Sequence, residues 1–393
     1  MTNDYVIGVH DDLSAVPAEA WDRLLLQQHG ATPFMRHAYL QALSLSGSAV
    51  PETGWELRVF TLHRQGELHA ATVLYLKPHS YGEYVFDWAW AQAYEQYGLR
   101  YYPKAVVAVP FTPVPGARLL AVDASARIAL VKHLIEWCGA QQLSSLHLLF
   151  GNADDVTACE DAGMLMRSTV QFHWEQRASE PPFADFEDFL RQLSQEKRKK
   201  IRQERRKVVD AGVRFRWARG RDISDADWQF FYRCYARTYR EHGNPPYLSA
   251  DFFARMSQTL PDAWLMFIAE REERAIACSL IGIDADQRVA YGRYWGAVER
   301  VDCLHFEACY YQPIEWCIAH GFQRFEGGAQ GEHKMARALM PVRTCSAHWL
   351  AHPAFADAVQ RFLDREGQGI DNYLAPGPSH PGILPHLPGS RSL

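Results

Sequence analysis

The sequence predicts a mixed α/β fold that contains two copies of one unit. A predicted β-hairpin at residues 57–76 recurs at residues 265–283 after a shift of 207 positions, with Phe60 over Phe267. The tetrapeptide Ile-Glu-Trp-Cys stands at 135–138 and again at 314–317, each time within a predicted helix that leads into a strand. Because these matches are collinear, we interpret the chain as a tandem duplication whose units exceed solenoid repeats in length.

Each unit is predicted to run hairpin, strand, helix, strand, helix, strand. The elements expected from periodicity and turn residues are helices at 17–29, 33–45, 124–142 and 304–320, hairpin strands at 57–62, 68–76, 265–269 and 275–283, and strands at 84–88, 146–150 and 322–326. The strand at Tyr84–Trp88 is expected to match Tyr291–Trp295. Strands joined through a helix lie parallel and hairpin strands lie antiparallel, so the predicted sheet is mixed.

Composition bounds the domain number and the class of protein. The chain has 393 residues, 48% of them hydrophobic, which is enough for two cores, and we expect units at 1–178 and 179–375 with a disordered Pro/Gly/Ser-rich tail at 376–393. The net charge of −5 does not predict nucleic-acid or anionic-membrane binding by the whole molecule. We expect no secretory signal, because the first residues lack a basic n-region and an apolar h-region, and no membrane span, because no apolar run approaches about 20 residues. Its eight cysteines contain no C-x-x-C pair, so they read as reduced thiols and the expected location is the cytoplasm. The oligomeric state stays open.

The stretch Phe322–Lys334 reads as a strand that breaks at glycines and enters a helix. The strand breaks at Gly327-Gly328, and Gly331 precedes a predicted helix at 332–339. Backbone N–H groups point outward at such a helix start, where an anion or oxyanion binds. Glu332, His333 and Lys334 there offer a base, an imidazole and a cation. The alternative is that Glu332 only complements the helix dipole and the glycines only make turns.

The first unit lacks this set of side chains. Its corresponding loop is Phe150–Val156, F-G-N-A-D-D-V, which has no Glu-His-Lys. Units that share a core and differ at one strand exit suggest that this exit carries the function. We therefore expect catalysis in the second unit.

A basic helix is predicted at residues 185–212, at the start of the second unit. Its segment 197–207 carries eight positive charges against one negative charge. Like charges four residues apart repel by a few tenths of a kcal/mol, so a helix selected only for stability would mix the signs. The candidates for polyanion binding are Lys197, Arg198, Lys200, Arg202, Arg205 and Arg206. A solvated charged face is the alternative.

Several motifs resemble those of a known family. They are H-S-Y-G-E-Y-V-F-D-W-A-W (79–90), P-F-T-P-V-P-G-A-R-L-L (110–120), Q-F-H-W (171–174), Y-G-R-Y-W-G (291–296), L-H-F-E (304–307) and G-A-Q-G-E-H-K (328–334). They resemble the predicted N-acyltransferases, or Fem-like peptidoglycan biosynthesis/recognition proteins, and the element order resembles the Gcn5-related N-acetyltransferase (GNAT) fold. The resemblance implies a tandem GNAT-like chain whose acyl donor lies where the sheet splits between two parallel strands.

The resemblance also implies an activity. We expect an N-acyltransferase that moves an acyl or aminoacyl group from aminoacyl-tRNA or acyl-CoA to an amine, in the second unit at the cleft between units. The donor is then a co-substrate and no cofactor is tightly bound. The acceptor is a small-molecule or peptide amine, and tRNA is a candidate partner.

The sequence departs from the acetyltransferase pattern at the loop that holds the CoA pyrophosphate. That loop should be Q/R-x-x-G-x-G/A, but residues 296–303 read G-A-V-E-R-V-D-C. In the first unit, a Tyr- and Pro-rich insert at 89–122 replaces the junction. Neither unit therefore shows a standard CoA site, which favours a bulkier or differently held donor.

Acyl transfer needs a base for the amine, donors for the oxyanion and a proton for the leaving group. The oxyanion donor is expected within Tyr291–Gly296, with Gly292 suited to a β-bulge. The catalytic candidates are Glu332, His333 and Glu307. The substrate-binding candidates are Lys334, Gln330, Gly328, Gly331, Tyr291, Arg293, His305, Asp87 and Glu83.

Two other classes of function stay open. One is a metal enzyme that uses His305, Glu307, Glu332 and His333, although residues adjacent or two apart do not share a helix face. The other is a non-catalytic module that binds a peptidoglycan precursor or RNA. Metal analysis would test the first, and assays with charged tRNA or acyl-CoA would test the second.

Overall fold

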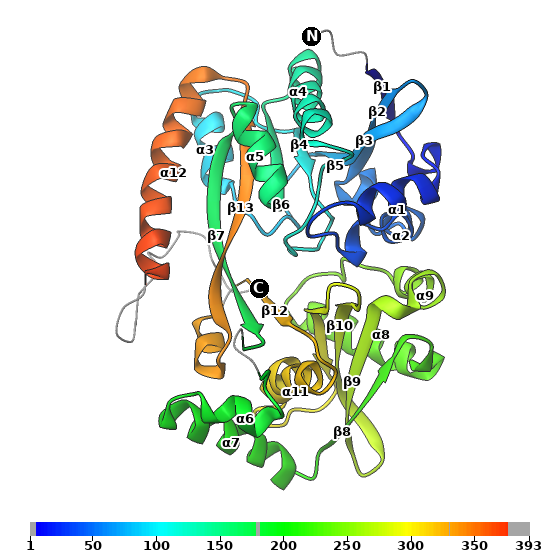
Figure 1. Cartoon of the computed structure of the whole chain (residues 1–393), viewed down its shortest axis with the longest axis vertical. Helices are drawn as coiled ribbons and strands as arrows, with labels where there is room; N and C mark the ends of the chain where they lie inside the picture. The colour runs from blue at the N-terminus through cyan, green and yellow to red at the C-terminus, as the bar shows by residue number, and fades with distance from the viewer. Residues whose placement is uncertain (1–4, 178–180, 330, 376–393) are drawn as a thin grey trace. The chain divides into compact units, whose positions relative to one another are not determined.

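The computed structural model describes residues 5–177, 181–329 and 331–375 (Figure 1). Its contacts divide the chain into two units. Unit one contains the chain up to Thr169 together with the segment that starts at Arg343, and unit two is Val170–Val342. This division differs from the expected boundary at 178/179, because the last strand and helix belong to unit one. The expected tail at 376–393 lies outside the described residues.

Unit one has a mixed sheet in the order β1-β2-β3-β4-β6-β13, with β5 beside β3. Its strands are β1 Val6–His10, β2 Glu56–Arg64, β3 Glu67–Lys77, β4 Lys104–Val107, β5 Leu120–Ala121, β6 Ser145–Gly151 and the greater part of β13 Met340–Leu350. Its α-helices are α1 Ala18–Leu26, α2 His37–Leu45, α3 Trp88–Gln96, α4 Ala124–Ala140, α5 Ala153–Asp161 and α12 Pro353–Leu374. The helices expected at 17–29 and 33–45 are present in shorter form, because 3-10 turns flank them.

Unit two has the sheet order β7-β12-β11-β10-β9-β8. Its strands are β7 Leu165–Glu175, β8 Arg214–Arg219, β9 Trp264–Arg271, β10 Arg274–Asp284, β11 Val289–Ala297 and β12 Arg324–Ala329. Its helices are α6 Phe186–Arg191, α7 Gln195–Asp210, α8 Asp225–Glu241, α9 Ala250–Thr259, α10 Leu304–Phe306, the π-helix η6 Glu307–Tyr311, α11 Gln312–Ala319 and the 3-10 helix η7 Glu332–Arg337.

The two hairpins share one register, which confirms the duplication. In unit one Phe60 pairs with Thr72, and in unit two Phe267 pairs with Ser279. Both members of the second pair lie 207 positions after those of the first. In each unit a helix then carries the Ile-Glu-Trp-Cys tetrapeptide and leads to a strand parallel to the third one, α4 to β6 and α11 to β12.

The last strand of each sequence repeat completes the sheet of the other unit. Residues 171–175 of β7, which ends the first repeat, pair with β12 in unit two. Residues 345–350 of β13, which ends the second repeat, pair with β6 in unit one. Hydrogen bonding therefore assigns the C-terminal strand to unit one. A single domain boundary along the sequence cannot describe this exchange of strands.

The strand expected at Tyr84–Trp88 is wrong. Tyr84 has a left-handed φ of 63° and Trp88 begins α3, so neither occupies a strand. Val106 of β4 takes the place of Tyr291, because it pairs with Tyr75 and His147 as Tyr291 pairs with Gly282 and Glu326. The prediction failed because residues 78–103 are inserted before the third strand of unit one, where an apparent match in sequence shifted the alignment.

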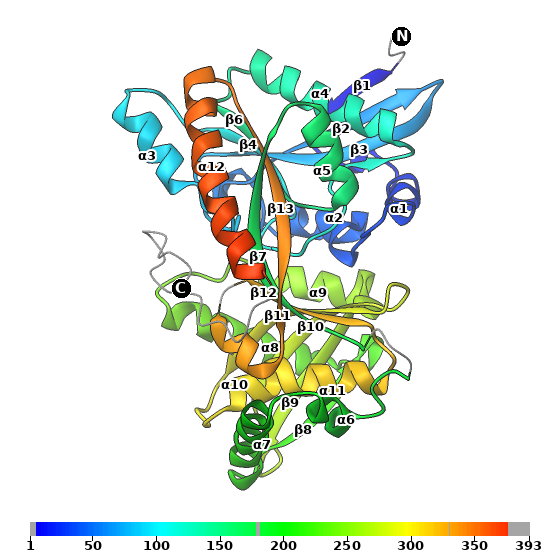
Figure 2. The ribbon, with the colours of Figure 1, turned by 60° about the vertical axis from the view of Figure 1, so that its left-hand side comes forward.

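Two predicted helices are interrupted. The helix expected at 185–212 is α6 followed by α7, and the Ser194 side chain accepts from Lys197 N as the N-cap of the second helix. Figure 2 shows α6 and α7 as separate helices, and α6 contacts α11 while α7 contacts η6 and η7. The helix expected at 304–320 contains five residues of π-helix. None of the described helices is long and apolar enough to cross a membrane.

Candidate active site

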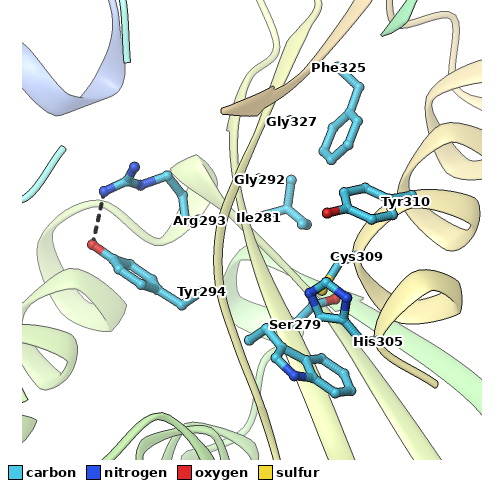
Figure 3. A pocket seen from close by; sticks show the side chains of 11 residues that line it. Ser279, Ile281, Gly292, Arg293, Tyr294, His305, Cys309, Tyr310, Phe325 and Gly327 are labelled. Atoms are coloured by element: carbon cyan, nitrogen blue, oxygen red, sulfur yellow. Dashed lines mark hydrogen bonds between the residues drawn. The ribbon is translucent and has the colours of Figure 1, made fainter. Parts of the chain in front are cut away.

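A cavity of about 140 Å³ lies in unit two where β11 and β12 separate (Figure 3). The parallel register of these strands ends, within the described residues, at the pair Tyr291 and Glu326. The next residues, Gly292 and Gly327, both line the cavity. Its other lining residues are Ser279, Ile281, Arg293, Tyr294, Trp295, His305, Cys309, Tyr310 and Phe325. This is the split between parallel strands that the resemblance implied.

A β-bulge shapes one wall, as expected at Gly292. Ile281 pairs with Gly292 and Leu280 pairs with Tyr294, so Arg293 is the extra residue. Figure 3 shows the side chains of Arg293 and Tyr294 on the side of β11 away from His305 and Tyr310. The Arg293 Nη2 donates to the Tyr294 hydroxyl at 3.0 Å. The bulge thus leaves backbone, with little side chain, at the edge of β11 that faces the split.

His305, Cys309 and Tyr310 form the opposite wall, on α10 and η6. The His305 ring contacts Trp295 at a centroid distance of 5.4 Å and Tyr310 at 5.7 Å. Burial, with His333 nearby, lowers the pKa of His305 to about 4, so its imidazole is neutral at pH 7. Burial raises the pKa values of Cys309 and Tyr310, which stay protonated.

Tyr310 connects the cavity to His333. The Tyr310 hydroxyl lies 3.3 Å from His333 Nε2 and donates to it when that nitrogen is unprotonated. Burial, together with Arg337 and Lys334, lowers the pKa of His333, although its side chain is exposed. The predicted catalytic residue His333 therefore approaches the cavity through Tyr310.

Lys334 corrects the expectation of an anion-binding cation. It is buried, and its ammonium donates to the carbonyl oxygens of Gly327, Gly328 and Ala329 at 2.7, 3.2 and 2.9 Å. Burial lowers the pKa of Lys334 to about 8. An ammonium has three donors, and all three are used here, so Lys334 holds the exit of β12 in shape.

Glu307 points away from the cavity, which corrects its expected role as a base. Its carboxylate accepts from Arg205 Nε at 3.2 Å and from Gln312 Nε2 at 2.7 Å. Its place at the start of the π-helix turns the side chain towards α7. Glu307 therefore joins α7 to the crossover helix.

The remaining predicted residues of the loop are placed as follows. Gly328 and Gly331 have φ values of 76° and 100°, which favour glycine, as expected for a sharp strand exit. The expected helix at 332–339 is the six-residue 3-10 helix η7. Gln330 lies outside the described residues, and the structure describes only the backbone of Glu332. Tyr291 is buried and does not line the cavity.

Glu83 and Asp87 belong to unit one and lie in a buried charge cluster. Lys104 Nζ donates to Glu83 at 2.7 Å and also to Asp87. Burial alone would raise the pKa of Asp87, but Lys104 and His147 hold it below its usual value. The expectation that these carboxylates bind substrate assumed an exposed strand. Both side chains are buried and bonded within unit one.

The basic residues of α7 do not form the continuous ridge that was expected. Arg202 pairs with Glu187 at 2.5 Å, and Arg205 turns inward to Glu307 and Glu315. Lys200 and Arg206 are exposed, while Lys197 and Arg198 are half-buried. Within the described residues, acidic side chains thus neutralise two of the six candidates.

Unit one fills the equivalent split. Between β4 and β5, residues 108–119 leave the sheet and return, so that Leu120 pairs with Ala71 as Gly296 pairs with Cys278. The buried Arg118 of this excursion donates from Nε to Leu149 O at 3.1 Å. The twelve residues of this excursion stand where unit two has three, residues 293–295, one of which is the bulge. The two units therefore differ at this strand exit, as the sequence predicts.

Sequence reasoning missed several residues that line the cavity: Ser279, Trp295, Cys309, Tyr310 and Phe325. Tyr310 lies five residues after His305, a spacing that reaches the same wall because the intervening turns are π-helical. Knowing where the π-helix lies would have been needed to predict that Tyr310 lines the cavity. The sequence of the π-helix does not differ from that of an ordinary α-helix, so the prediction missed it. Over the described part of the chain, no three His, Cys, Asp or Glu side chains form a metal-binding group.

The family model that matches residues 12–379 is the FemAB-like family, described as peptidoglycan biosynthesis/recognition. The chain belongs to this family. Among curated proteins, no sequence matches this FemAB-like chain.

Three solved structures share the fold of this FemAB-like protein. FemX has a TM-score of 0.52 and 10% identity, covering 88% of this chain and 98% of its own. The C-terminal domain of a putative lysylphosphatidylglycerol synthetase from Agrobacterium fabrum has a TM-score of 0.51 and 10% identity, covering 88% and 95%. L-PGS from Bacillus licheniformis has a TM-score of 0.51 and 11% identity, covering 88% and 97%. At such identities the likeness shows the fold alone, a tandem GNAT-like chain.

Proposed function

We propose that this FemAB-like chain is an N-acyltransferase that moves an acyl or aminoacyl group from an activated donor to an amine, within the strand split of unit two. The observation that carries the proposal is the cavity at the β11–β12 split, where a bulged backbone edge faces a wall of neutral, proton-bearing side chains. A carbonyl placed in the split would meet backbone N–H groups of the bulge as its oxygen becomes anionic.

Two side chains of the opposite wall suit the proton transfers. The neutral His305 accepts the proton that the attacking nitrogen loses when the new N–C bond forms. Tyr310 gives its proton to the leaving oxygen or sulfur atom as the donor's acyl bond breaks. His333, bonded to Tyr310 and exposed, returns a proton from solvent. Protons and bonds then balance with no further reactant.

The family description supports an acceptor amine on a peptidoglycan precursor. The donor class, aminoacyl-tRNA or acyl-CoA, is what the assay must separate. Residues 298–303, which follow β11, lack the glycine-rich loop that would hold a CoA pyrophosphate, and this favours aminoacyl-tRNA.

The test is transfer by the full chain to an amine-bearing peptidoglycan precursor peptide, with product mass as the readout. We expect product with aminoacyl-tRNA and none with acyl-CoA. Gly292→Val should abolish transfer, because a Cβ there lies 3.2 Å from the Phe325 ring and a valine would fill the split. Gly139→Val in α4, where a Cβ meets no atom within 4 Å, is the control.

The second candidate function is recognition without catalysis, which the family description also names. If the wild-type chain binds the precursor but forms no product with either donor class, the result favours recognition over transfer. If product forms with acyl-CoA alone, the chain is still an N-acyltransferase, but its donor is acyl-CoA and not aminoacyl-tRNA.

A further inference from the structure

A row of three buried side chains crosses unit two on the face of the sheet opposite the cavity. Glu326 of β12 pairs with His173 of β7 on one side and with Tyr291 of β11 on the other. Successive side chains of a strand point to opposite faces, and Phe325 lines the cavity. Glu326 therefore points to the other face, the one on which α8 packs against β10 and β11.

Two atoms of this row have no hydrogen-bond partner among the described residues. They are Glu326 Oε2 and His173 Nε2, which lie 3.9 Å apart. Each residue is only 5% exposed. The other carboxylate oxygen, Oε1, accepts from Arg324 Nε at 2.9 Å. Buried polar atoms are almost always paired, because an unpaired one costs about 1–3 kcal/mol. The two atoms can therefore accept hydrogen bonds from a ligand.

The charges around the pair define the ligand. Burial, with Glu175 adding to it and Arg324 opposing it, raises the pKa of Glu326 to about 7. Burial, with Arg324 and Lys334, lowers the pKa of His173 to about 3, so its ring is neutral. In the tautomer protonated at Nδ1, His173 Nε2 is an acceptor. Two facing acceptors, one of them a carboxylate oxygen, fit a cation that carries several N–H donors and reject an anion.

We propose that Glu326 and His173 bind the primary ammonium group of the acyl acceptor. This inference rests on the proposed N-acyltransferase function and adds the acceptor site to it. Glu326 lies between Phe325 and Gly327, two residues that line the cavity, and it belongs to the last β11–β12 pair before the split. Arg293 and Tyr294, whose side chains lie on the side of β11 away from His305, also line the cavity, so an amine held on that face reaches the carbonyl through the split. Transfer of one ammonium proton to Glu326 Oε2 breaks an N–H bond, forms an O–H bond and frees the lone pair for attack.

Amine binding in the absence of any acyl donor tests the site. The full chain is titrated by calorimetry with n-butylammonium chloride and, at equal ionic strength, with tetramethylammonium chloride, which has the same charge and no N–H. We expect the wild-type chain to bind only the primary ammonium. Glu326→Gln should weaken binding roughly ten- to a hundredfold, as loss of a charge-assisted hydrogen bond does, and His173→Phe should weaken it several-fold. Glu270→Gln, whose carboxylate pairs with Arg216 on β8, is the matched control.

Equal binding of the two cations by the wild-type chain, or unchanged affinity in both Glu326→Gln and His173→Phe, would overturn the site. The first comparison needs no variant, so it decides the matter even if a variant fails to fold. Failure of the proposed function is a separate result. Butylammonium binding that depends on Glu326, in a chain that yields no product with either donor class, would keep the amine site and remove the transferase. If the chain transfers the acyl group and the KM for the amine is unchanged in Glu326→Gln, the transferase function stands and the amine site at Glu326 is wrong.

Discussion

At the scale of single residues, burial sets the protonation state of the candidate site. The cavity holds a neutral imidazole at His305 and a protonated phenol at Tyr310, because low polarity disfavours their charged forms. Across the sheet, burial leaves Glu326 poised near neutrality. Tyr310→Phe should therefore alter the chemistry, and Glu326→Gln should also alter how stability depends on pH.

Tyr310→Phe removes the hydroxyl that connects the cavity to His333 while keeping the ring. If Tyr310 supplies the proton for the leaving group, kcat should fall by about a hundredfold or more with little change in KM. Steady-state kinetics with the active donor measure this. Tyr232→Phe on α8 is the matched control and should leave kcat unchanged. An unaltered kcat in Tyr310→Phe would remove the tyrosine from the chemistry.

Glu326→Gln should change how stability depends on pH. Because the folded pKa is about 7 and the unfolded value 4.5, the stability that protonated Glu326 contributes is present below pH 4.5 and is lost as pH rises through 7. Glutamine does not titrate. Between pH 4.5 and 8 the free energy of unfolding of the variant should therefore rise by about 3 kcal/mol relative to that of the wild type, at about 1.4 kcal/mol per pKa unit. Urea unfolding at both pH values measures the difference. Parallel pH curves for the two proteins would contradict it.

At the scale of elements, one buried ion pair joins the basic helix α7 to the 3-10 helix η7. Glu204 of α7 accepts from Arg337 Nη2 of η7 at 2.7 Å and from the Tyr311 hydroxyl of η6. The Arg337 guanidinium also stacks on Phe306, 3.3 Å from the ring centroid. These contacts hold η7, and with it His333, beside the crossover helix. The charged helix thus has a structural role, whatever its exposed lysines bind.

Glu204→Leu should destabilise the chain strongly, since it leaves Arg337 buried without its carboxylate. Loss of one partner of a buried pair costs about 3–5 kcal/mol. The exposed pair Arg202–Glu187 offers a matched control, and Glu187→Leu should cost at most about 1 kcal/mol. Denaturant unfolding of both variants checks the contrast. Similar losses in the two proteins would show that burial of the Glu204 pair does not matter.

At the scale of the whole molecule, each unit depends on a strand from the other repeat. Unit one needs β13 beside β6, and it needs α12, whose Val359 and Leu363 pack with Trp90 and Tyr94. Neither sequence repeat can therefore complete its own sheet. Folding of the two units is expected to be linked through the chain itself.

A chain that ends at Val342 should fail to fold unit one. It exposes the edge of β6 and removes the buried side chains of Leu350, Val359 and Leu363, each of which stabilises by about 1.5–3 kcal/mol. Limited proteolysis should cut the first 169 residues rapidly. A chain that ends at Ala375 keeps every contact described here and should resist the protease as the full chain does. Equal resistance of the Val342 truncation would contradict the exchange of strands.

The sequence by itself determined the duplication, the mixed sheet and the hairpin registers. These follow from local patterns, because strand alternation and the Ile-Glu-Trp-Cys tetrapeptide occur in both repeats. It also placed the bulge at Gly292, and the predicted residues His305 and Arg293 line the cavity. Composition and spacing suffice wherever the determining contacts lie close in the chain.

Only the tertiary structure decided which candidate side chains face the cavity. Glu307 and Lys334 were expected to be functional charged groups. Glu307 instead pairs with Arg205 of α7, and Lys334 donates to three carbonyl oxygens, because a buried charge is stable only when it is paired or hydrogen-bonded. The wall at Tyr310 depends on a π-helix, and the exchange of β7 and β13 depends on pairing between distant segments. Such contacts join residues far apart in sequence, so no local pattern records them.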